Sequence, residues 1–151
     1  MSDVRIVVRP PLENEYDQWA GLFRVYRDFY RLVPDEAVVV RVWSWIQDPD
    51  HETRALVAVL DGNLVGLAHY RRFARPSTGT IGLYLDDLLT VPPHRGSGIG
   101  RALIAAVADR ARAEGCSVIR WITAEDNTSA QRLYDQVGTR TTWLTYDLQL
   151  A

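Results

Sequence analysis

The chain has 151 residues, with 17 Lys and Arg against 19 Asp and Glu, a formal net charge of −2 and 47% hydrophobic residues. This length fits one domain, so we expect residues 1–151 to form a single unit that buries roughly 70% of its unfolded surface without disulfides. The composition excludes disordered and collagen-like chains, and the lack of net positive charge argues against a protein that mainly binds nucleic acid.

The cysteine content and the N-terminal residues bear on location. A single cysteine, Cys116, excludes an intrachain disulfide and a cysteine-rich zinc site, and it suits a reducing compartment. Residues 1–5 lack the apolar core of a signal peptide, and no window approaches the apolar length of a membrane span. We therefore expect a cytoplasmic protein that requires neither a membrane nor a metal.

The first third of the chain predicts one strand and two helices. Val4–Arg9 is a β-branched run that two prolines end, which predicts a short strand. From Glu13 to Phe29, large apolar and mostly aromatic residues recur at three- and four-residue steps, as in an amphipathic helix. Residues 35–47 open with acidic residues and carry apolar residues at helical spacing, which predicts a second helix.

The centre of the chain predicts a hairpin, a long strand and a helix. Asp61-Gly62 separates two apolar runs between Ala55 and Phe73, which is the signal of a β-hairpin. Residues 81–91 form a third apolar run and the longest candidate strand. Residues 98–114 carry one apolar stripe and end at Gly115, a residue favoured just beyond a helix.

The last third predicts a buried strand at 118–123, a short helix at 128–137 and a final strand at 139–150, which is rich in β-branched and aromatic residues. The predicted order is therefore β-α-α-β-β-β-α-β-α-β, with no internal repeat or linker. The strand at 139–150 could lie at a sheet edge, and exposed edges are commonly paired or covered. For this reason we expect a homodimer.

A glycine-rich turn, residues 95–101 (Arg-Gly-Ser-Gly-Ile-Gly-Arg), joins the longest strand to the following helix. Glycines let successive backbone N–H groups face one concavity, and a helix N-terminus adds partial positive charge, so the turn suits a pyrophosphate. The Rossmann fingerprint fails because Arg101 stands where its third glycine belongs, and no Gly-Lys-Ser/Thr of a P-loop exists. The alternative is that the glycines only build a tight turn.

The segment Arg95-Gly96-Ser97-Gly98-Ile99-Gly100 resembles the [Q/R]-x-x-G-x-[G/A] motif of the GNAT acetyltransferase superfamily. Residues 84–88 (Tyr-Leu-Asp-Asp-Leu) are similar to the acid-bearing strand of polyamine-type members. Residues 121–127, with Ala130 and residues 133–135, are similar to the branch that includes a yeast histone and polyamine acetyltransferase. The resemblance covers about residues 55–146.

The resemblance implies an α+β (α/β) fold: a mixed, mostly antiparallel twisted sheet of six to seven strands flanked by about four helices. Its fourth and fifth strands would be parallel neighbours that splay apart, and acetyl-CoA would enter this slot without a metal. The resemblance assigns the pantetheine arm to the backbone near Leu88, Leu89 and Thr90. It assigns the pyrophosphate to Arg95, Gly96, Ser97, Gly98, Ile99, Gly100 and Arg101, although the two arginines could instead be structural.

The resemblance also implies an N-acetyltransferase that moves the acetyl group of acetyl-CoA to a primary amine by direct attack in a ternary complex. The acceptor would be a small amine, a polyamine, an amino acid or a lysine side chain, and CoA would be the product. Asp86 or Asp87 would accept the amine proton; because adjacent strand residues point to opposite faces, we expect at most one of them to be catalytic.

For each of three further residues, the sequence allows a functional role and a structural role. Tyr134 would protonate the CoA sulfur, or it would only pack in the core. Asn127 matches a residue that contacts the cofactor side, or it would cap the helix that follows. His69 could serve as a base, although a lone histidine is more often a surface or core residue.

The acceptor pocket is less defined by the sequence. The aromatic first helix would form one wall, with Tyr30, Trp43 and Tyr70 as candidate contacts.

Two other functions compete with acetyl transfer: a non-catalytic acyl-CoA-binding or regulatory domain, and a module that binds another adenylate. The acid and Tyr134 together favour catalysis, and the failed nucleotide fingerprints disfavour the adenylate module.

Overall fold

The computed structural model describes residues 5–150 of the chain. Short 3₁₀ turns at Glu13–Glu15 and Pro92–His94 precede α1 and α3. In chain order the elements are β1 (Val7–Arg9), α1 (Tyr16–Phe29), α2 (Glu36–Gln47), β2 (Arg54–Leu60), β3 (Asn63–Arg75), β4 (Thr80–Thr90), α3 (Ile99–Ala113), β5 (Ile119–Arg120) and α4 (Thr128–Val137).

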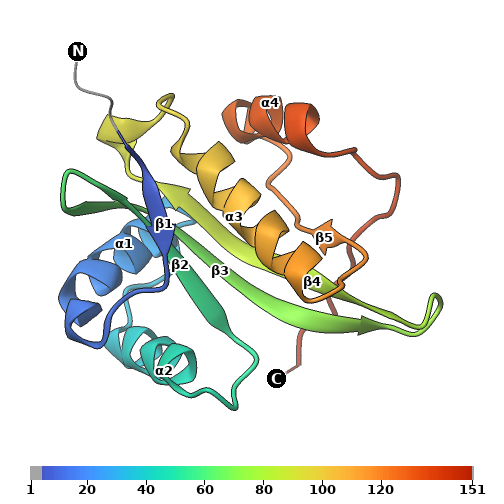
Figure 1. The fold of residues 1–151 in the computed structure, drawn as a ribbon, viewed down its shortest axis with the longest axis horizontal. Helices are drawn as coiled ribbons and strands as arrows, with labels where there is room; N and C mark the ends of the chain where they lie inside the picture. The colour runs from blue at the N-terminus through green and yellow to red at the C-terminus, as the bar shows by residue number, and fades with distance from the viewer. Residues whose placement is uncertain (1–4, 151) are drawn as a thin grey trace.

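The strands form one sheet in the order β1-β2-β3-β4-β5 (Figure 1). The first four strands are antiparallel neighbours, whereas β5 runs parallel to β4 and pairs with it only at Leu83↔Ile119 and Tyr84↔Arg120. The parallel pair follows from the crossover through α3, which returns the chain to the end of the sheet where β4 began. The expected mixed sheet with a parallel fourth and fifth strand is confirmed.

Helices cover both faces of this sheet, as Figure 1 shows. Alternate residues of β2 separate the two cores, because successive side chains of a strand point to opposite faces. Leu56 and Ala58 pack with α3, whereas Ala55 and Val57 pack with α1 and α2. The four expected helices are all present, and Asp35 caps α2 by accepting a hydrogen bond from the backbone N–H of Ala37 at 3.0 Å.

Two predicted strands differ from the structure. The buried strand expected at 118–123 pairs only at Ile119–Arg120, because β4 and the chain after β5 diverge beyond Tyr84. The strand predicted at 139–150 is wrong as an element of this chain, because these residues are exposed and pair with no strand that the structure describes. The described sheet therefore has five strands rather than six or seven. Val4, the predicted start of the first strand, lies outside the described residues.

Gly66 sets how closely α3 approaches the sheet. A Cβ atom built at this position would lie 2.6 Å from Cγ2 of Ile99 and 3.1 Å from Cδ1 of Leu103. Both of these α3 side chains are buried at 1% exposure or less. A side chain on residue 66 would therefore push away the first turns of the helix that follows the glycine-rich turn.

We predict that Gly66→Ala lowers the free energy of unfolding by about 1 to 3 kcal/mol, the usual cost of overpacking a core. Thermal denaturation followed by circular dichroism measures this loss. Gly21→Ala in α1 is the matched control, because a Cβ there meets no atom within 4 Å and alanine favours a helix. Equal stability of Gly66→Ala and wild type would contradict the close packing.

Candidate functional site

A β-bulge in β4 shapes the site. His69 pairs with Asp87 and Tyr70 pairs with Leu85, so Asp86 is the extra residue with no partner on β3. A bulge shifts the alternation of side chains by one residue. As a result, both Asp86 and Asp87 line the same cavity, on the α1 and α2 side of the sheet. The expectation that the two carboxylates would face opposite sides is corrected by this bulge.

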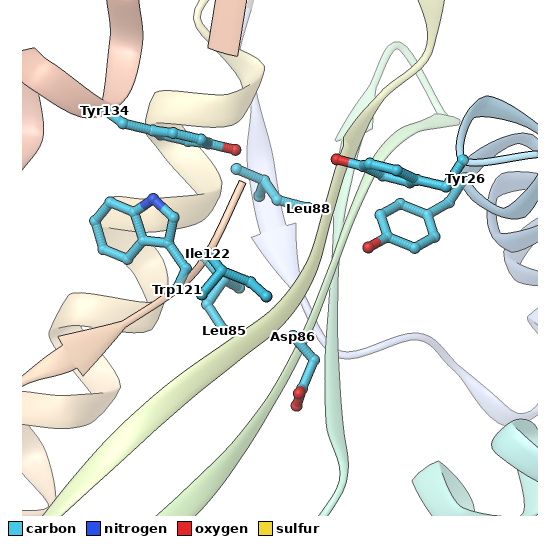
Figure 2. A pocket seen from close by; sticks show the side chains of 8 residues that line it. Tyr26, Leu85, Asp86, Leu88, Trp121, Ile122 and Tyr134 are labelled. Atoms are coloured by element: carbon cyan, nitrogen blue, oxygen red, sulfur yellow. The ribbon is translucent and has the colours of Figure 1, made fainter. Parts of the chain in front are cut away.

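Beyond the bulge, β4 and the chain after β5 enclose a first cavity. Leu85, Asp86 and Leu88 line it from β4, and Trp121 and Ile122 line it from the residues that follow β5. Tyr134 of α4 and Tyr26 of α1 reach this cavity from opposite sides, as Figure 2 shows. The structure thus brings the predicted residues Tyr134, Asp86 and Leu88 together, and the predicted Tyr30 lines the same cavity.

Tyr134 is held against an aromatic neighbour and partly removed from water. Its ring contacts Trp121 edge-on, with centroids 5.5 Å apart. Burial raises the pKa of Tyr134 to about 12, so the phenol keeps its proton throughout the neutral range. Asn127 begins α4 as its cap, since its side chain accepts a hydrogen bond from the backbone N–H of Ala130 at 3.3 Å.

Asp87 ends a buried chain of hydrogen bonds. The indole N–H of Trp19 donates to Nε2 of His69 at 3.1 Å, and Nδ1 of His69 lies 2.8 Å from Oδ2 of Asp87. Because an indole nitrogen can only donate, Nε2 must accept and the His69 proton sits on Nδ1, facing the carboxylate. His69 is 2% exposed, so it is a core residue that orients Asp87.

Asp86 is more accessible and has a different partner. Nε of Arg71 donates to its two carboxylate oxygens at 3.1 and 3.3 Å. Partial burial raises the pKa of Asp86, and the positive charge of Arg71 opposes this rise. Asp86 lines both cavities, and in Figure 2 its carboxylate points away from the Tyr134 hydroxyl.

The second cavity has a volume of about 430 Å³ and lies on the α1 and α2 side of the sheet. Three acidic residues and several aromatic rings surround it, and the ring of Trp45 stacks on His51 with centroids 4.9 Å apart. Its lining residues are Phe23, Val42, Trp45, His51, Glu52, Thr53, His69, Arg71, Asp86 and Asp87. The loop residues 51–53 carry no motif, so sequence reasoning did not find them.

Two predicted acceptor contacts lie elsewhere. Trp43 packs in the core against Trp19 and Tyr16, with ring centroids 5.0 and 5.6 Å apart. Tyr70 is 5% exposed and belongs to the core under α3, on the opposite face from the second cavity. Ordinary alternation along β3 is the reason, because Tyr70 follows His69 directly and therefore points to the other face of the sheet. Neither Trp43 nor Tyr70 lines a described cavity.

The glycine-rich turn lies between β4 and α3, as the sequence predicts, and two of its glycines have left-handed backbone. Gly96 and Gly98 have φ values of 81° and 86°, a region that residues with a Cβ rarely adopt, and α3 begins directly afterwards at Ile99. The first amides of a helix have no acceptor within it, so they are available to an anion. Arg95 lies 5.3 Å from the ring centre of Phe29, and Arg101 donates to Gln136, so both arginines have protein contacts.

The edge of β4 from Leu85 to Thr90 continues past the last pair with β5 and leads into this turn. Leu88, Leu89 and Thr90 pair with β3 on their other side. The hydroxyl of Thr123, after β5, is buried without a hydrogen-bond partner among residues 5–150. An open strand edge, an unpaired buried hydroxyl and a glycine turn at a helix start together fit a long ligand that ends in a pyrophosphate.

Among residues 5–150, no cluster of three or more His, Cys, Asp or Glu side chains could hold a metal ion. Over the same residues, no helix combines the length and apolar character needed to cross a bilayer.

Comparisons with known proteins agree with this architecture. The sequence model of the acetyltransferase (GNAT) family matches residues 19–139. The D-amino-acid N-acetyltransferase HPA3 of Saccharomyces cerevisiae is 28% identical over 148 residues, which cover 97% of this chain and 92% of that protein. The L-ornithine N5-acetyltransferase NATA1 of Arabidopsis thaliana is 30% identical over 97 residues, covering 62% of this chain and 41% of that protein.

Solved structures share the fold. The ribosomal-protein-alanine N-acetyltransferase of Brucella melitensis biovar Abortus 2308 superposes with a TM-score of 0.79 at 26% identity, over 99% of this chain and 100% of that chain. The aminoglycoside N-acetyltransferase AAC(6')-Iy in complex with CoA superposes with a TM-score of 0.81 at 20% identity, over 99% and 97% of the two chains. The family match spans most of the sheet and both cavities, and the chain therefore belongs to the GNAT family, as an acyl-CoA-dependent N-acetyltransferase.

Proposed function

We propose that this protein transfers the acetyl group of acetyl-CoA to a small primary amine by direct attack in a ternary complex. The observation that carries the proposal is the position of Asp86, which lines both cavities, while Tyr134 lines only the first. A carboxylate on the acceptor side and a neutral phenol on the other side supply the base and the acid that amide formation from a thioester needs.

The first cavity and the glycine-rich turn are the proposed acetyl-CoA site. The open edge of β4 at Leu88, Leu89 and Thr90 would pair with the pantetheine amides as an added strand does. The backbone of residues 95–101, at the start of α3, would bind the pyrophosphate, and Asn127 would hold α4 beside it. When bound, acetyl-CoA supplies an activated acetyl thioester, and the protein supplies orientation and proton transfer.

The second cavity is the proposed acceptor site. Glu52, Asp86 and Asp87 give it negative charge, and Phe23 and Trp45 give it aromatic walls. Such a lining suits a small cationic amine, an amino acid or a polyamine better than an acidic acceptor. Relatives of this chain carry names that specify D-amino acids, L-ornithine and thialysine as acceptors, all of which bear an amine.

We assign the two carboxylates different roles. Asp86 accepts the amine proton through a bridging water, because its carboxylate points away from Tyr134. Asp87 is fixed by His69 and contributes negative charge that attracts the acceptor. Tyr134 gives its proton to the departing sulfur. The wider proposal is that one domain carries out this reaction in the cytoplasm as a homodimer.

Gly98→Ala tests the cofactor site. We predict that it weakens acetyl-CoA binding about tenfold or more, because a Cβ at positive φ forces the turn to move and removes an amide contact to a charged group. Isothermal titration calorimetry measures the affinity, with ATP and NAD as competing ligands. Gly115→Ala is the matched control: its φ of 71° brings the same strain at the other end of α3.

The result that would overturn the cofactor assignment is wild-type protein that binds neither acetyl-CoA nor CoA. Equal losses of affinity in Gly98→Ala and Gly115→Ala would instead assign the effect to stability.

Tyr134→Phe tests the general acid. We predict that kcat falls by roughly 10²-fold or more, the usual contribution of a general acid, while acetyl-CoA affinity stays unchanged. Release of free thiol with a panel of amines measures the rate, and calorimetry measures the affinity. Tyr16→Phe, which removes a hydroxyl from the aromatic core between α1 and α2, is the control. Unchanged kcat would contradict the role, and an inactive wild type that binds acetyl-CoA would favour a non-catalytic domain.

Asp86→Asn tests the base. We predict a loss of kcat of roughly 10²-fold. In wild type the rate falls as the pH drops through the Asp86 pKa, because the protonated carboxyl cannot accept a proton. Arg71 lowers this pKa, so Arg71→Gln raises it and moves the acidic limb of the kcat profile to higher pH. Asp109→Asn, at an exposed acid of α3, is the control. If the acidic limb of the kcat profile has the same pH in Arg71→Gln as in wild type, Asp86 is not the titrating group.

A further inference from the structure

His69 is a buried titratable residue between the core and the second cavity. Its side chain is 3% exposed, whereas that of Asp87 is 23% exposed, and both residues line the cavity. Nδ1 of His69 lies 2.8 Å from Oδ2 of Asp87, a distance that fits a neutral histidine as well as an imidazolium. The negative charge of Asp87 favours the imidazolium and burial opposes it, so this contact alone does not set the charge of the pair.

Trp19 determines which of the two states the histidine has. Its indole N–H donates to Nε2 of His69, with 3.1 Å between the two nitrogens. An indole nitrogen can only donate, and so can both nitrogens of an imidazolium. A second proton on His69 would therefore place two N–H groups against each other. Only the neutral form with its proton on Nδ1 satisfies Trp19, His69 and Asp87 together.

The packing around Trp19 keeps its N–H directed at the histidine. Trp19 is 0% exposed and His69 is 2% exposed, so both rings are shielded from solvent. The rings of Phe23 and Trp43 cover them, with Phe23 edge-on to His69 at 5.0 Å and Trp43 at 5.0 Å from Trp19, both between centroids. Neither ring offers a hydrogen-bond acceptor atom. A buried N–H that loses its acceptor is costly, so the indole retains Nε2 as its partner.

The charge of the second cavity depends on the state of this histidine. Of the three acidic residues that line the cavity, Asp86 is paired with Arg71, whose Nε lies 3.1 Å from its carboxylate. Glu52 and Asp87 therefore supply the remaining negative charge. A neutral His69 fixes the position of Asp87 without cancelling its charge, whereas an imidazolium would form a neutral pair with it.

We propose that Trp19 is a positioning residue that acts through His69: it keeps His69 uncharged, so that Asp87 presents a full negative charge to the ammonium group of the acceptor. This inference rests on the acceptor role that the proposed function gives to Asp87. Trp19 lines neither of the two described cavities, so its influence on acceptor binding passes through the hydrogen bonds rather than through contact.

Nitrogen-15 NMR of the histidine rings tests the protonation state and requires no activity. We expect His69 of wild type to keep one protonated nitrogen, Nδ1, from about pH 8 down to about pH 5. In Trp19→Phe we expect both nitrogens to become protonated over this range, because no donor opposes the second proton beside the carboxylate. His69→Asn identifies the signals of His69 among those of the three histidines.

Two further variants separate the hydrogen bond from the packing. β-(3-Benzothienyl)alanine in place of Trp19, introduced by nonsense suppression, keeps the ring shape but has sulfur where the indole has N–H, and it should behave like Trp19→Phe. Trp43→Phe removes the same atoms from the same core but leaves the bond to His69, and it should behave like wild type. An imidazolium in wild type, or a neutral His69 throughout in the benzothienyl variant, would overturn the proposal.

Steady-state kinetics tests the consequence for the acceptor, with the amine of the panel that has the lowest KM for wild type. In Trp19→Phe the KM for this amine, relative to wild type, should rise about fivefold or more between about pH 8 and about pH 6, the effect of one charge about 4 Å away in water. The KM for acetyl-CoA should stay unchanged. Trp19→Phe/His69→Asn should lose this pH dependence, because asparagine can donate to Asp87 but takes up no proton.

Other groups near the pair contribute equally to wild type and variants, so the ratio of their KM values reports His69. The titratable and charged groups that face the pair are Asp86 on β4, Arg71 on β3, Tyr26 on α1, and His51 and Glu52 before β2.

Asp87→Asn distinguishes the inference from the proposed function. If it raises the KM for the amine while Trp19→Phe has the wild-type KM at every pH, the inference is overturned. If Asp87→Asn leaves this KM unchanged, the acceptor role of Asp87 in the proposed function fails, and the nitrogen signals of His69 still decide whether Trp19 controls its charge.

Discussion

The bulge at Asp86 is the constraint on which the site depends. Regular alternation along β4 would send one of the two neighbouring acids into the α3 core, where a carboxylate without a partner is costly. The extra residue turns both carboxylates to the same side, so that Arg71 meets one and His69 meets the other. After the bulge, β4 no longer pairs with the chain beyond β5. One irregularity therefore positions the acids and precedes the opening that becomes the first cavity.

The two acids differ because their surroundings differ. His69 is fixed by Trp19 in the core between α1 and the sheet, so the geometry of Asp87 is determined by packing that forms when the protein folds. Asp86 has a partner at the surface, since the Arg71 side chain is 35% exposed and can move with solvent. A rigid carboxylate suits attraction of an acceptor, whereas a carboxylate in contact with water suits proton exchange. This contrast is the physical basis for assigning proton transfer to Asp86.

Helices and turns, which depend on neighbouring residues in the sequence, were predictable. The glycine-rich turn joins β4 to α3 as expected, and the helices begin and end close to the expected residues. Tyr134 lies on the predicted short helix and lines the first cavity. Features that depend on register were not predictable. No sequence pattern in β4 indicates the bulge. The hydrogen bond from Trp19 to His69 joins residues 50 positions apart, and the loop 51–53 contributes to the second cavity only because the fold brings it there. Tyr70 belongs to the core under α3, and only the fold shows which face of the sheet carries the second cavity.

The C-terminal segment shows that strand propensity alone does not produce a strand. Residues 139–150 have the composition and alternation of a strand, yet a strand exists only when its backbone groups find a neighbour. Within one chain the described structure supplies none, and the apolar side chains stay in water. The prediction of a strand at these residues therefore fails, because composition and alternation supply no hydrogen-bonding neighbour.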